Sequence, residues 1–303
     1  MDLKYVVLEG ADCSGKTTLF EGLHAATNYK YNIQDRSNLS MYIHSKLYER
    51  NDSNTWYKEL WNELKSFKTL YVVLLPEDDV IRDRIAKRGD DKQTPDSAVN
   101  INNEFRKLCN FHFRDMFPNI LVLNIDSNTT NEDLIDTICN RIYTISNTTA
   151  PELIKSLVFA SGKNELTDIS LRRKVFSMEE KLQPIMWQVL NYPPEKEYYD
   201  KIRTKMIRKI EKELYGIGGK GVQKTDSRRF IFSGEECISF IHTLYRENEL
   251  NVKAVMRSSN VYNTLWADYE FLRIICLDIA NALNIQKSEI YLDLEIRSAH
   301  INP

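Results

Sequence analysis

The sequence lacks any apolar run long enough to span a membrane, and its first residues lead almost at once into a predicted strand, leaving no room for a signal peptide. Its five cysteines show neither paired spacing nor a C-x-x-C motif, which argues against a disulfide framework and a structural zinc site. The formal net charge of −2 argues against a protein dominated by nucleic-acid electrostatics. We therefore expect a soluble, cytoplasmic protein with free thiols and no membrane contact.

The sequence does have the length and apolar content for two globular domains. It contains 303 residues, of which 42% are hydrophobic and 28% charged, an ordinary composition for a chain with a well-packed core. The stretch 146–151 is polar, lacks periodicity and contains a proline. We therefore predict one domain over residues 1–147 and a second over 148–303.

A phosphate-binding loop opens the first domain. Residues 5–8 form an apolar, β-branched run typical of a buried strand, and residues 10–17 match G-x-x-x-x-G-K-[ST] without a mismatch before a helical pattern begins. Lys16 would supply charge for the β- and γ-phosphates of ATP, and the Thr17 hydroxyl would ligate Mg²⁺. The alternative is a glycine-rich turn without a ligand. The predicted ATP-phosphate residues are Gly10, Ala11, Asp12, Cys13, Ser14, Gly15, Lys16, Thr17 and Thr18.

Strands and helices alternate through the rest of this domain. The predicted strands cover 30–36, 69–75 and 119–125, and the predicted helices cover 38–48, 55–67, 76–89 and 134–145. This order predicts an α/β fold in which a parallel sheet lies between two helical layers. Because sites in such folds gather at the carboxyl ends of strands, we expect Asp35 and Arg36 to lie beside Lys16.

The predicted catalytic set is Lys16, Asp35, Arg36, Arg84 and Arg88. Phosphoryl transfer needs positive charge around the equatorial oxygens, which the lysine and arginines would supply. Asp35 would accept or orient the proton of the acceptor. The alternatives are a solvated helix face for Arg84 and Arg88, and an exposed strand end for Asp35 and Arg36.

Three segments resemble the thymidylate-kinase group of P-loop kinases. They are Glu9–Thr18, the triplet Asp35-Arg36-Ser37, and residues 82–91, the last of which resemble the arginine-bearing lid of small phage members. The resemblance covers residues 1–145 and implies a P-loop kinase fold that uses ATP and Mg²⁺. It also implies that Asp12 contacts the sugar 3′-hydroxyl of a monophosphate, and that Asp35 and Arg36 position the acceptor.

Helical patterns begin the second domain at 151–161, 177–190 and 201–215, and a loop is predicted at 216–221. In the third helix the apolar residues are four apart, whereas the opposite face is basic. The basic residues are Arg203, Lys205, Arg208, Lys209 and Lys212. The segment 201–212 is therefore either a contact for DNA or a solvated face.

The remainder resembles the thymidylate synthases and their hydroxymethylase relatives. The resemblance rests on Ser227-Arg228-Arg229 with a strand at 230–233, on Arg257–Val261, on a helix at 266–283 and on residues 298–302. It implies an α+β thymidylate-synthase-like domain, a pocket for a pyrimidine nucleotide and a homodimer. The implied pocket residues are Arg228, Arg229, Cys237, Arg257, Ser258, Asn260, Asp268, His300 and Asn302.

The resemblance assigns these residues different roles. Arg228, Arg229, Arg257 and Ser258 would bind the phosphate, for which clustered guanidinium groups are well suited. Cys237 lies 20 residues before Arg257, as the nucleophile of the family does, but Glu235 and Glu236 beside it oppose a thiolate. It would otherwise be a small buried hydrophobic side chain.

Asp268 occupies the position where the synthases keep an asparagine, and an aspartate is typical of the cytosine-type hydroxymethylases. His300 and Asn302 match the ribose-contacting pair. The alternative for this half is a synthase-like scaffold kept only for dimerisation.

These observations favour an ATP- and Mg²⁺-dependent kinase of a pyrimidine deoxynucleotide, fused to a pyrimidine-nucleotide-binding and dimerisation domain. A second hypothesis is a kinase of hydroxymethyl-pyrimidine in DNA. A third is a nucleotide sensor without transfer activity. The fourth is a bifunctional kinase and pyrimidine hydroxymethylase that uses Cys237 and Asp268.

Overall fold

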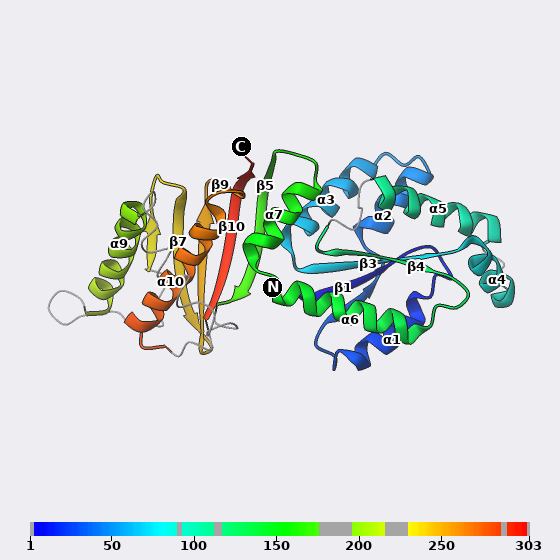
Figure 1. Cartoon of the computed structure of the whole chain (residues 1–303), viewed down its shortest axis with the longest axis horizontal. Coiled ribbons are helices and arrows are strands. Elements are labelled where there is room, and N and C mark those ends of the chain that lie inside the picture. Colours follow the sequence, from blue (N-terminus) through cyan, green and yellow to red (C-terminus); the bar gives the residue numbers. More distant parts are fainter. Residues whose placement is uncertain are drawn as a thin grey trace. The chain divides into compact units, whose positions relative to one another are not determined.

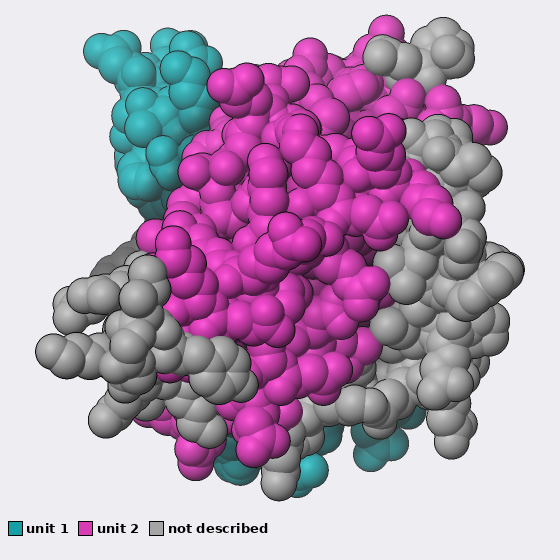
Figure 2. All heavy atoms as spheres, turned by 90° about the vertical axis from the view of Figure 1, so that its left-hand side faces the viewer, with its two compact units in different colours: residues 1–148 teal, residues 149–303 magenta. Residues whose placement is uncertain are grey.

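The computed structural model describes residues 3–89, 93–111, 117–175, 196–215, 230–285 and 290–301. The chain divides into two compact units, residues 1–148 and 149–303, which Figure 2 colours separately. The boundary expected from the sequence falls between 147 and 148. Several predicted features lie outside the described residues. They are the helix at 177–190, the loop at 216–221, the triplet Ser227-Arg228-Arg229, residues 90 and 91 of the arginine-bearing segment, and Asn302.

Unit 1 contains a four-stranded parallel sheet. Its strands are β1 (Tyr5–Glu9), β2 (Asn32–Asp35), β3 (Thr69–Pro76) and β4 (Ile120–Ile125), in the order β2-β1-β3-β4. Every neighbouring pair is parallel, so the carboxyl ends of all four strands meet at one edge. Every residue of β3 is buried, as expected for a central strand covered on both faces.

Helices cover both faces of this sheet (Figure 1). One face carries α1 (Lys16–Ala26) and α6 (Asn131–Asn147), whose apolar residues share a core with those of the strands. The other carries α2 (Asn38–Leu47), α3 (Ser53–Ser66) and α5 (Pro95–Phe111). The last helix, α4 (Asp78–Arg88), follows β3. The predicted three-layer α/β fold is confirmed.

Helix α5 is the element of unit 1 that the sequence analysis did not identify. Pro95 stands at its first position, where the missing N–H of proline would have no helical partner in any case. Ala98, Ile101, Phe105 and Leu108 are buried at spacings of three and four residues. The periodic signal was therefore present, although the proline and the polar residues around it made the segment look like a loop.

Unit 2 contains a mixed sheet in the order β5-β10-β8-β7-β6. The strands are β5 (Glu165–Lys174), β6 (Ile231–Ser233), β7 (Ile238–Arg246), β8 (Glu249–Met256) and β10 (Ile290–His300), and the short β9 (Ser259–Asn260) also pairs with β10. Strand β10 is antiparallel to β5 and parallel to β8. Buried and partly buried residues alternate along most of β10, so one face of the sheet forms the core.

Three described helices belong to this unit, namely α7 (Ala150–Ala160), α9 (Lys196–Tyr215) and α10 (Leu265–Ala282). They correspond to the helices predicted at 151–161, 201–215 and 266–283. The predicted α+β class is thus confirmed, although the long strands β5, β7 and β8 were not assigned from the sequence. In the part of the chain that the structure describes, no helix has the length and apolar character to cross a membrane.

Candidate functional site

The predicted phosphate-binding loop, called the phosphate loop below, connects β1 to α1 and is curled by residues with positive φ. Gly10 and Gly15 have φ angles of 138° and 104°, and Cys13 has a φ of 62°, which is uncommon for a residue other than glycine. A Cβ atom on Gly10 would lie 2.6 Å from the carbonyl oxygen of Leu74. Glycine is therefore required at position 10 both by the backbone conformation and by the close approach of β3.

Lys16 lies inside the curl of the loop. Its ammonium group donates hydrogen bonds of 2.8 Å to the carbonyl oxygens of Gly10 and Ala11, and its side chain is almost completely buried. Burial lowers the pKa of this ammonium group, whereas the carboxylate of Asp35 acts in the opposite direction. Two backbone carbonyl oxygens of the loop thus fix the position of the Lys16 side-chain nitrogen.

A cavity of about 630 Å³ opens beside this loop. Its lining residues are Asp12, Cys13, Ser14, Gly15, Lys16, Thr17, Thr18, Asp35, Arg84, Arg88 and Asn131. Four of the five residues predicted to be catalytic thus line one cavity, together with most of the predicted ATP-phosphate residues. They come from three places in the sequence, namely the loop with the start of α1, the end of β2 and helix α4, which the parallel sheet brings to one edge.

The fifth predicted catalytic residue, Arg36, is joined to the loop by an ion pair. Its guanidinium group donates to the carboxylate of Asp12, and its backbone N–H donates to the carbonyl oxygen of Leu8. Arg36 also has a positive φ of 70°. A residue other than glycine keeps such a left-handed backbone conformation only where the surrounding structure fixes it. The two contacts of Arg36 therefore hold the turn after β2 against the loop.

Two arginines of α4 reach the opposite side of the loop. The guanidinium group of Arg84 donates to the carbonyl oxygen of Cys13 at 3.2 Å, and that of Arg88 contacts the Cys13 sulfur at 3.7 Å. Arg84 is partly buried and Arg88 is exposed. Both therefore lie at the cavity, where their charge is available to a phosphate group.

The loop has the features that a nucleotide phosphate and Mg²⁺ require. Gly15, which has no side chain for capping, precedes the first turn of α1, so the N–H groups of residues 16–18 are available to an anion at the positive end of the helix dipole. The Thr17 hydroxyl and the Asp35 carboxylate line the same cavity. Such oxygen ligands are the ones that Mg²⁺ prefers.

Two residues in or beside this site were given no role in the sequence analysis. Asn131, the first residue of α6, lines the cavity, and a polar residue after a strand and a short loop gives no distinctive signal. Glu9 lies directly before the loop and is completely buried. A charged residue at the end of an apolar run was a signal that could have identified Glu9.

The structure also brings together part of the set predicted in unit 2. Cys237 and Arg257 are linked because the backbone N–H of Arg257 donates to the Cys237 carbonyl oxygen at 2.7 Å. The Cys237 sulfur is exposed and lies 3.9 Å from the hydroxyl of Ser258. The pairing of β7 with β8 places these residues, which are 20 positions apart, at one end of the two strands.

Asn260 and His300 form a second group. They are direct partners in the pairing of β9 with β10, and the N–H of Val261 donates to the His300 carbonyl oxygen. The Asn260 side-chain oxygen accepts hydrogen bonds from the backbone N–H groups of Tyr262 and Asn263. Part of the hydrogen-bonding capacity of the Asn260 amide is thus used to shape the turn before α10.

Asp268 is buried within the unit, with 4% of its surface exposed. Its two carboxylate oxygens accept hydrogen bonds of 3.1 Å each, one from the hydroxyl of Tyr199 in α9 and one from that of Ser259 in β9. The carboxylate therefore joins three elements of the fold. Its predicted role in reading a pyrimidine base stays a prediction.

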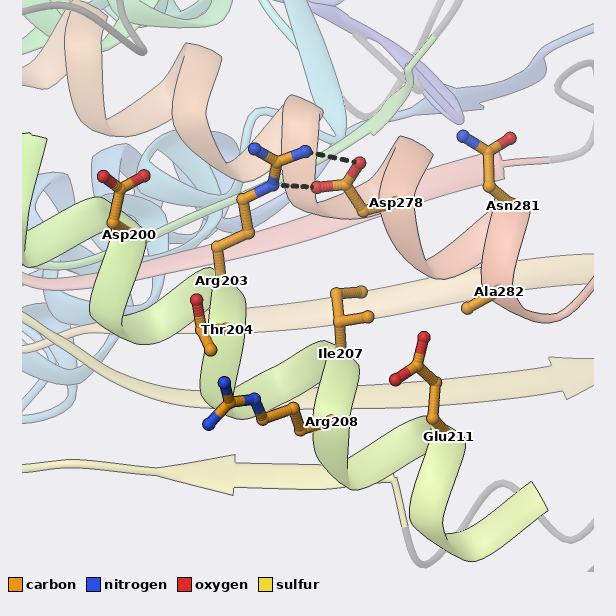
Figure 3. Close-up of a pocket in the computed structure, with 9 residues that line it drawn as sticks. All are labelled: Asp200, Arg203, Thr204, Ile207, Arg208, Glu211, Asp278, Asn281 and Ala282. Atoms are coloured by element: carbon orange, nitrogen blue, oxygen red, sulfur yellow. Dashed lines mark hydrogen bonds and ion pairs between the residues drawn. The ribbon is translucent and has the colours of Figure 1, made fainter. Parts of the chain in front are cut away.

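The basic helix α9 packs its apolar residues inward and forms a groove of about 480 Å³ with α10 (Figure 3). Arg203 points across this groove to Asp278 and donates two hydrogen bonds to its carboxylate. Asp200 and Glu211 line the same groove, whose charge is therefore mixed. The exposed basic residues are Lys205, Arg208, Lys209 and Lys212, and their contact with DNA stays a prediction.

The chain resembles solved structures in parts only, and neither a family model nor a curated protein matches it. The YorR protein of Bacillus subtilis, solved in complex with phosphorylated GDP, is 16% identical with a TM-score of 0.39, over 48% of this chain and 99% of YorR. Thermostable thymidylate synthase A of Bacillus subtilis is 11% identical with a TM-score of 0.29, over 45% of this chain and 66% of its own. Thymidylate synthase of T4 phage is 14% identical with a TM-score of 0.31, over 51% of this chain and 76% of the phage enzyme.

Proposed function

We propose that unit 1 transfers the γ-phosphoryl group of ATP to a pyrimidine deoxynucleotide. The observation that carries this proposal is the single cavity that gathers the phosphate loop, Asp35, Arg84 and Arg88. Phosphoryl transfer depends on positioning and on electrostatic stabilisation, with little covalent chemistry for the protein to perform. A buried ammonium group, two guanidinium groups and a carboxylate around one space suit that reaction.

Each of these groups has a task in the proposed reaction. Lys16 and the N–H groups at the start of α1 bind the donor phosphates, and Arg84 and Arg88 stabilise the charge on the transferred group. Asp35 and Arg36 position the acceptor monophosphate, so that one of its phosphate oxygens bonds to the γ-phosphorus as the bond to the leaving ADP breaks. The Thr17 hydroxyl would hold Mg²⁺, which when bound neutralises charge on the phosphate oxygens.

For unit 2 we propose binding of a pyrimidine nucleotide and assembly of a homodimer. The cluster of Cys237, Arg257 and Ser258 supports the binding site, because a guanidinium and a hydroxyl at one strand end suit a phosphate. The dimer follows from the resemblance at Ser227-Arg228-Arg229, residues that in the synthase family reach the neighbouring subunit. Transfer chemistry at Cys237 would be a further activity.

A second candidate for unit 1 is the phosphorylation of hydroxymethyl-pyrimidine in DNA. It is favoured by the exposed basic residues of α9, of which Arg208 and Lys212 are examples. The ion pair between Asp12 and Arg36 is compatible with a DNA acceptor as well. In DNA the 3′-oxygen is esterified and offers no free hydroxyl to Asp12, but Arg36 already provides Asp12 with a partner.

The decisive experiment incubates the protein with Mg²⁺ and γ-labelled ATP, and offers either free pyrimidine monophosphates or hydroxymethylated duplex DNA. We expect label on a monophosphate; label on the duplex instead would support the second candidate. Lys16→Ala should lower kcat roughly 100- to 1000-fold because it removes charge from the transferred phosphate. Lys87→Ala, which changes an exposed lysine of α4 outside the cavity lining, is the matched control.

Tight ATP binding without transfer to either acceptor would contradict the kinase and leave a nucleotide sensor. Tritium released from C5 of dCMP or dUMP, and abolished in Cys237→Ala, would establish the bifunctional enzyme. A Lys16→Ala variant that turns over at the wild-type rate would show that the site is elsewhere.

A further inference from the structure

Glu9 is a completely buried carboxylate that the proposed reaction does not use. It is the last residue of β1, directly before the phosphate loop, and both of its oxygens accept hydrogen bonds from α2. Burial raises the pKa of this carboxyl group, against the lowering effect of the same hydrogen bonds. Burying a carboxyl group costs free energy unless hydrogen bonds compensate for the lost hydration, so the contacts of Glu9 indicate a structural or functional role.

The Glu9 carboxylate accepts its hydrogen bonds from the N-cap and the first turn of α2. One oxygen accepts from the hydroxyl of Ser37 at 2.5 Å and from the backbone N–H of Ser40 at 3.4 Å, and the other accepts from the hydroxyl of Ser40. Ser37 is the N-cap of this helix. Glu9 therefore satisfies N-terminal groups of α2 from a neighbouring element, where the helix dipole favours negative charge.

A second carboxylate holds the same turn from the other side. Glu63 of α3 accepts hydrogen bonds from the side-chain amide of Asn38 and from the hydroxyl of Tyr71, which lies on the central strand β3. Burial raises the pKa of Glu63 as well. The start of α2 is thus fixed from both β1 and α3.

The hydrogen bonds to Glu9 and Glu63 fix the turn that carries Asp35 and Arg36. These residues directly precede Ser37, and Arg36 keeps its left-handed backbone conformation beside the loop. We infer that Glu9 is a positioning residue, which fixes the acceptor-side turn Asp35–Ser37 relative to the phosphate loop. The inference rests on the proposed kinase activity, because donor and acceptor phosphates must be aligned for in-line transfer.

The test compares Glu9→Gln with Ser40→Ala, and uses Ser45→Ala as the matched control. Ser45 is an equally buried serine of α2, but its hydroxyl donates to Asp52 rather than to the loop. A loosened turn misplaces the acceptor by a fraction of an ångström to an ångström, which costs roughly 10- to 100-fold. We expect Glu9→Gln to raise the acceptor KM and lower kcat by that factor in total, with the KM for ATP changed less than about two-fold.

Ser40→Ala should show the same pattern at smaller amplitude, and Ser45→Ala should show neither change. Equal changes in both KM values, or an unchanged acceptor KM in a folded Glu9→Gln variant, would overturn the inference. Ser40→Ala decides the question if Glu9→Gln does not fold.

A readout without catalysis separates this inference from the kinase proposal. In Glu9→Gln the backbone amides of Arg36 and Ser40 should exchange with solvent roughly ten-fold faster, whereas that of Leu19 in α1 keeps its wild-type rate. Absence of transfer by the wild-type protein would overturn the proposed function alone, and unchanged exchange at Arg36 and Ser40 would overturn the positioning role.

Discussion

The two candidate sites differ in how the chain assembles them. In unit 1 the core of the site is a continuous stretch, residues 10–18, whose backbone groups face a cavity. In unit 2 the corresponding residues belong to separate strands and turns, and meet only through the pairing of β7 with β8 and of β9 with β10. The first site therefore depends on backbone conformation, and the second on sheet register and side-chain chemistry.

This difference has a consequence for substitutions. A change that alters the backbone should damage the phosphate loop more than the loss of most side chains there. In unit 2 the removal of one charged side chain should weaken binding while the sheet stays intact. The predictions below test this contrast, beginning with the largest expected effect.

Gly10→Ala should abolish nucleotide binding by unit 1 and lower the free energy of unfolding by about 2–4 kcal/mol. The new Cβ would meet the Leu74 carbonyl oxygen at 2.6 Å, in a backbone conformation with a φ of 138°. Gly89→Ala is the control, because Gly89 also has a positive φ but its Cβ would meet nothing within 4 Å. It should cost only about 1 kcal/mol and leave ATP binding intact.

The measurements are urea unfolding and titration with ATP in the presence of Mg²⁺. If both variants lose the same free energy of unfolding, the close approach of β3 to the loop does not contribute to the cost of Gly10→Ala. Retained ATP affinity in a folded Gly10→Ala variant would break the proposed dependence of this site on backbone conformation.

Arg257→Ala should weaken the binding of dUMP and dCMP by unit 2 roughly 10- to 100-fold, because a charge-assisted hydrogen bond to phosphate contributes about 1.5–3 kcal/mol. Arg246→Ala is the control. Arg246 ends β7, whereas Cys237 directly precedes that strand, so the two positions are separated by its full length. Calorimetric titration measures both affinities, and equal effects of the two variants would contradict a phosphate site at Arg257.

The same contrast explains how much of the molecule the sequence predicted. The loop from Gly10 to Thr18 could be located to the residue, because a local glycine pattern between a strand and a helix has few other uses. The proximity of Asp35 followed from the general rule for parallel sheets. Asn131 could not be found in this way, because its place depends on how far the loop after β4 extends.

In unit 2 the long strands were not assigned from the sequence, and their patterns differ in strength. In β10 the period of two is present in the sequence, because buried aliphatic residues alternate with Tyr291, Asp293, Glu295 and Arg297. In β7 it is weak, because apolar and aromatic residues also occupy partly buried positions. The grouping of Cys237 with Ser258 depends on the pairing of β7 with β8, and that of Asn260 with His300 on the pairing of β9 with β10. Resemblance to a family pointed to these residues, but only the pairing of the strands shows which of them lie together.

The smallest effect is expected for Asp268→Asn. The carboxylate accepts from two hydroxyl groups, those of Tyr199 and Ser259, whereas an asparagine side chain has one oxygen acceptor and one nitrogen that donates. One hydroxyl would then have to accept from the new amide nitrogen instead of donating to a carboxylate. We expect the free energy of unfolding to fall by about 1 kcal/mol, and by less than about 0.5 kcal/mol in the control Asp200→Asn, which changes an exposed residue of α9. Because both oxygens are engaged inside the fold, the relative affinities for dUMP and dCMP should stay the same. A changed preference between the two bases would instead give Asp268 the recognition role expected from the hydroxymethylase resemblance. The nucleotide site of unit 2 would then include a buried side chain as well as the exposed ones.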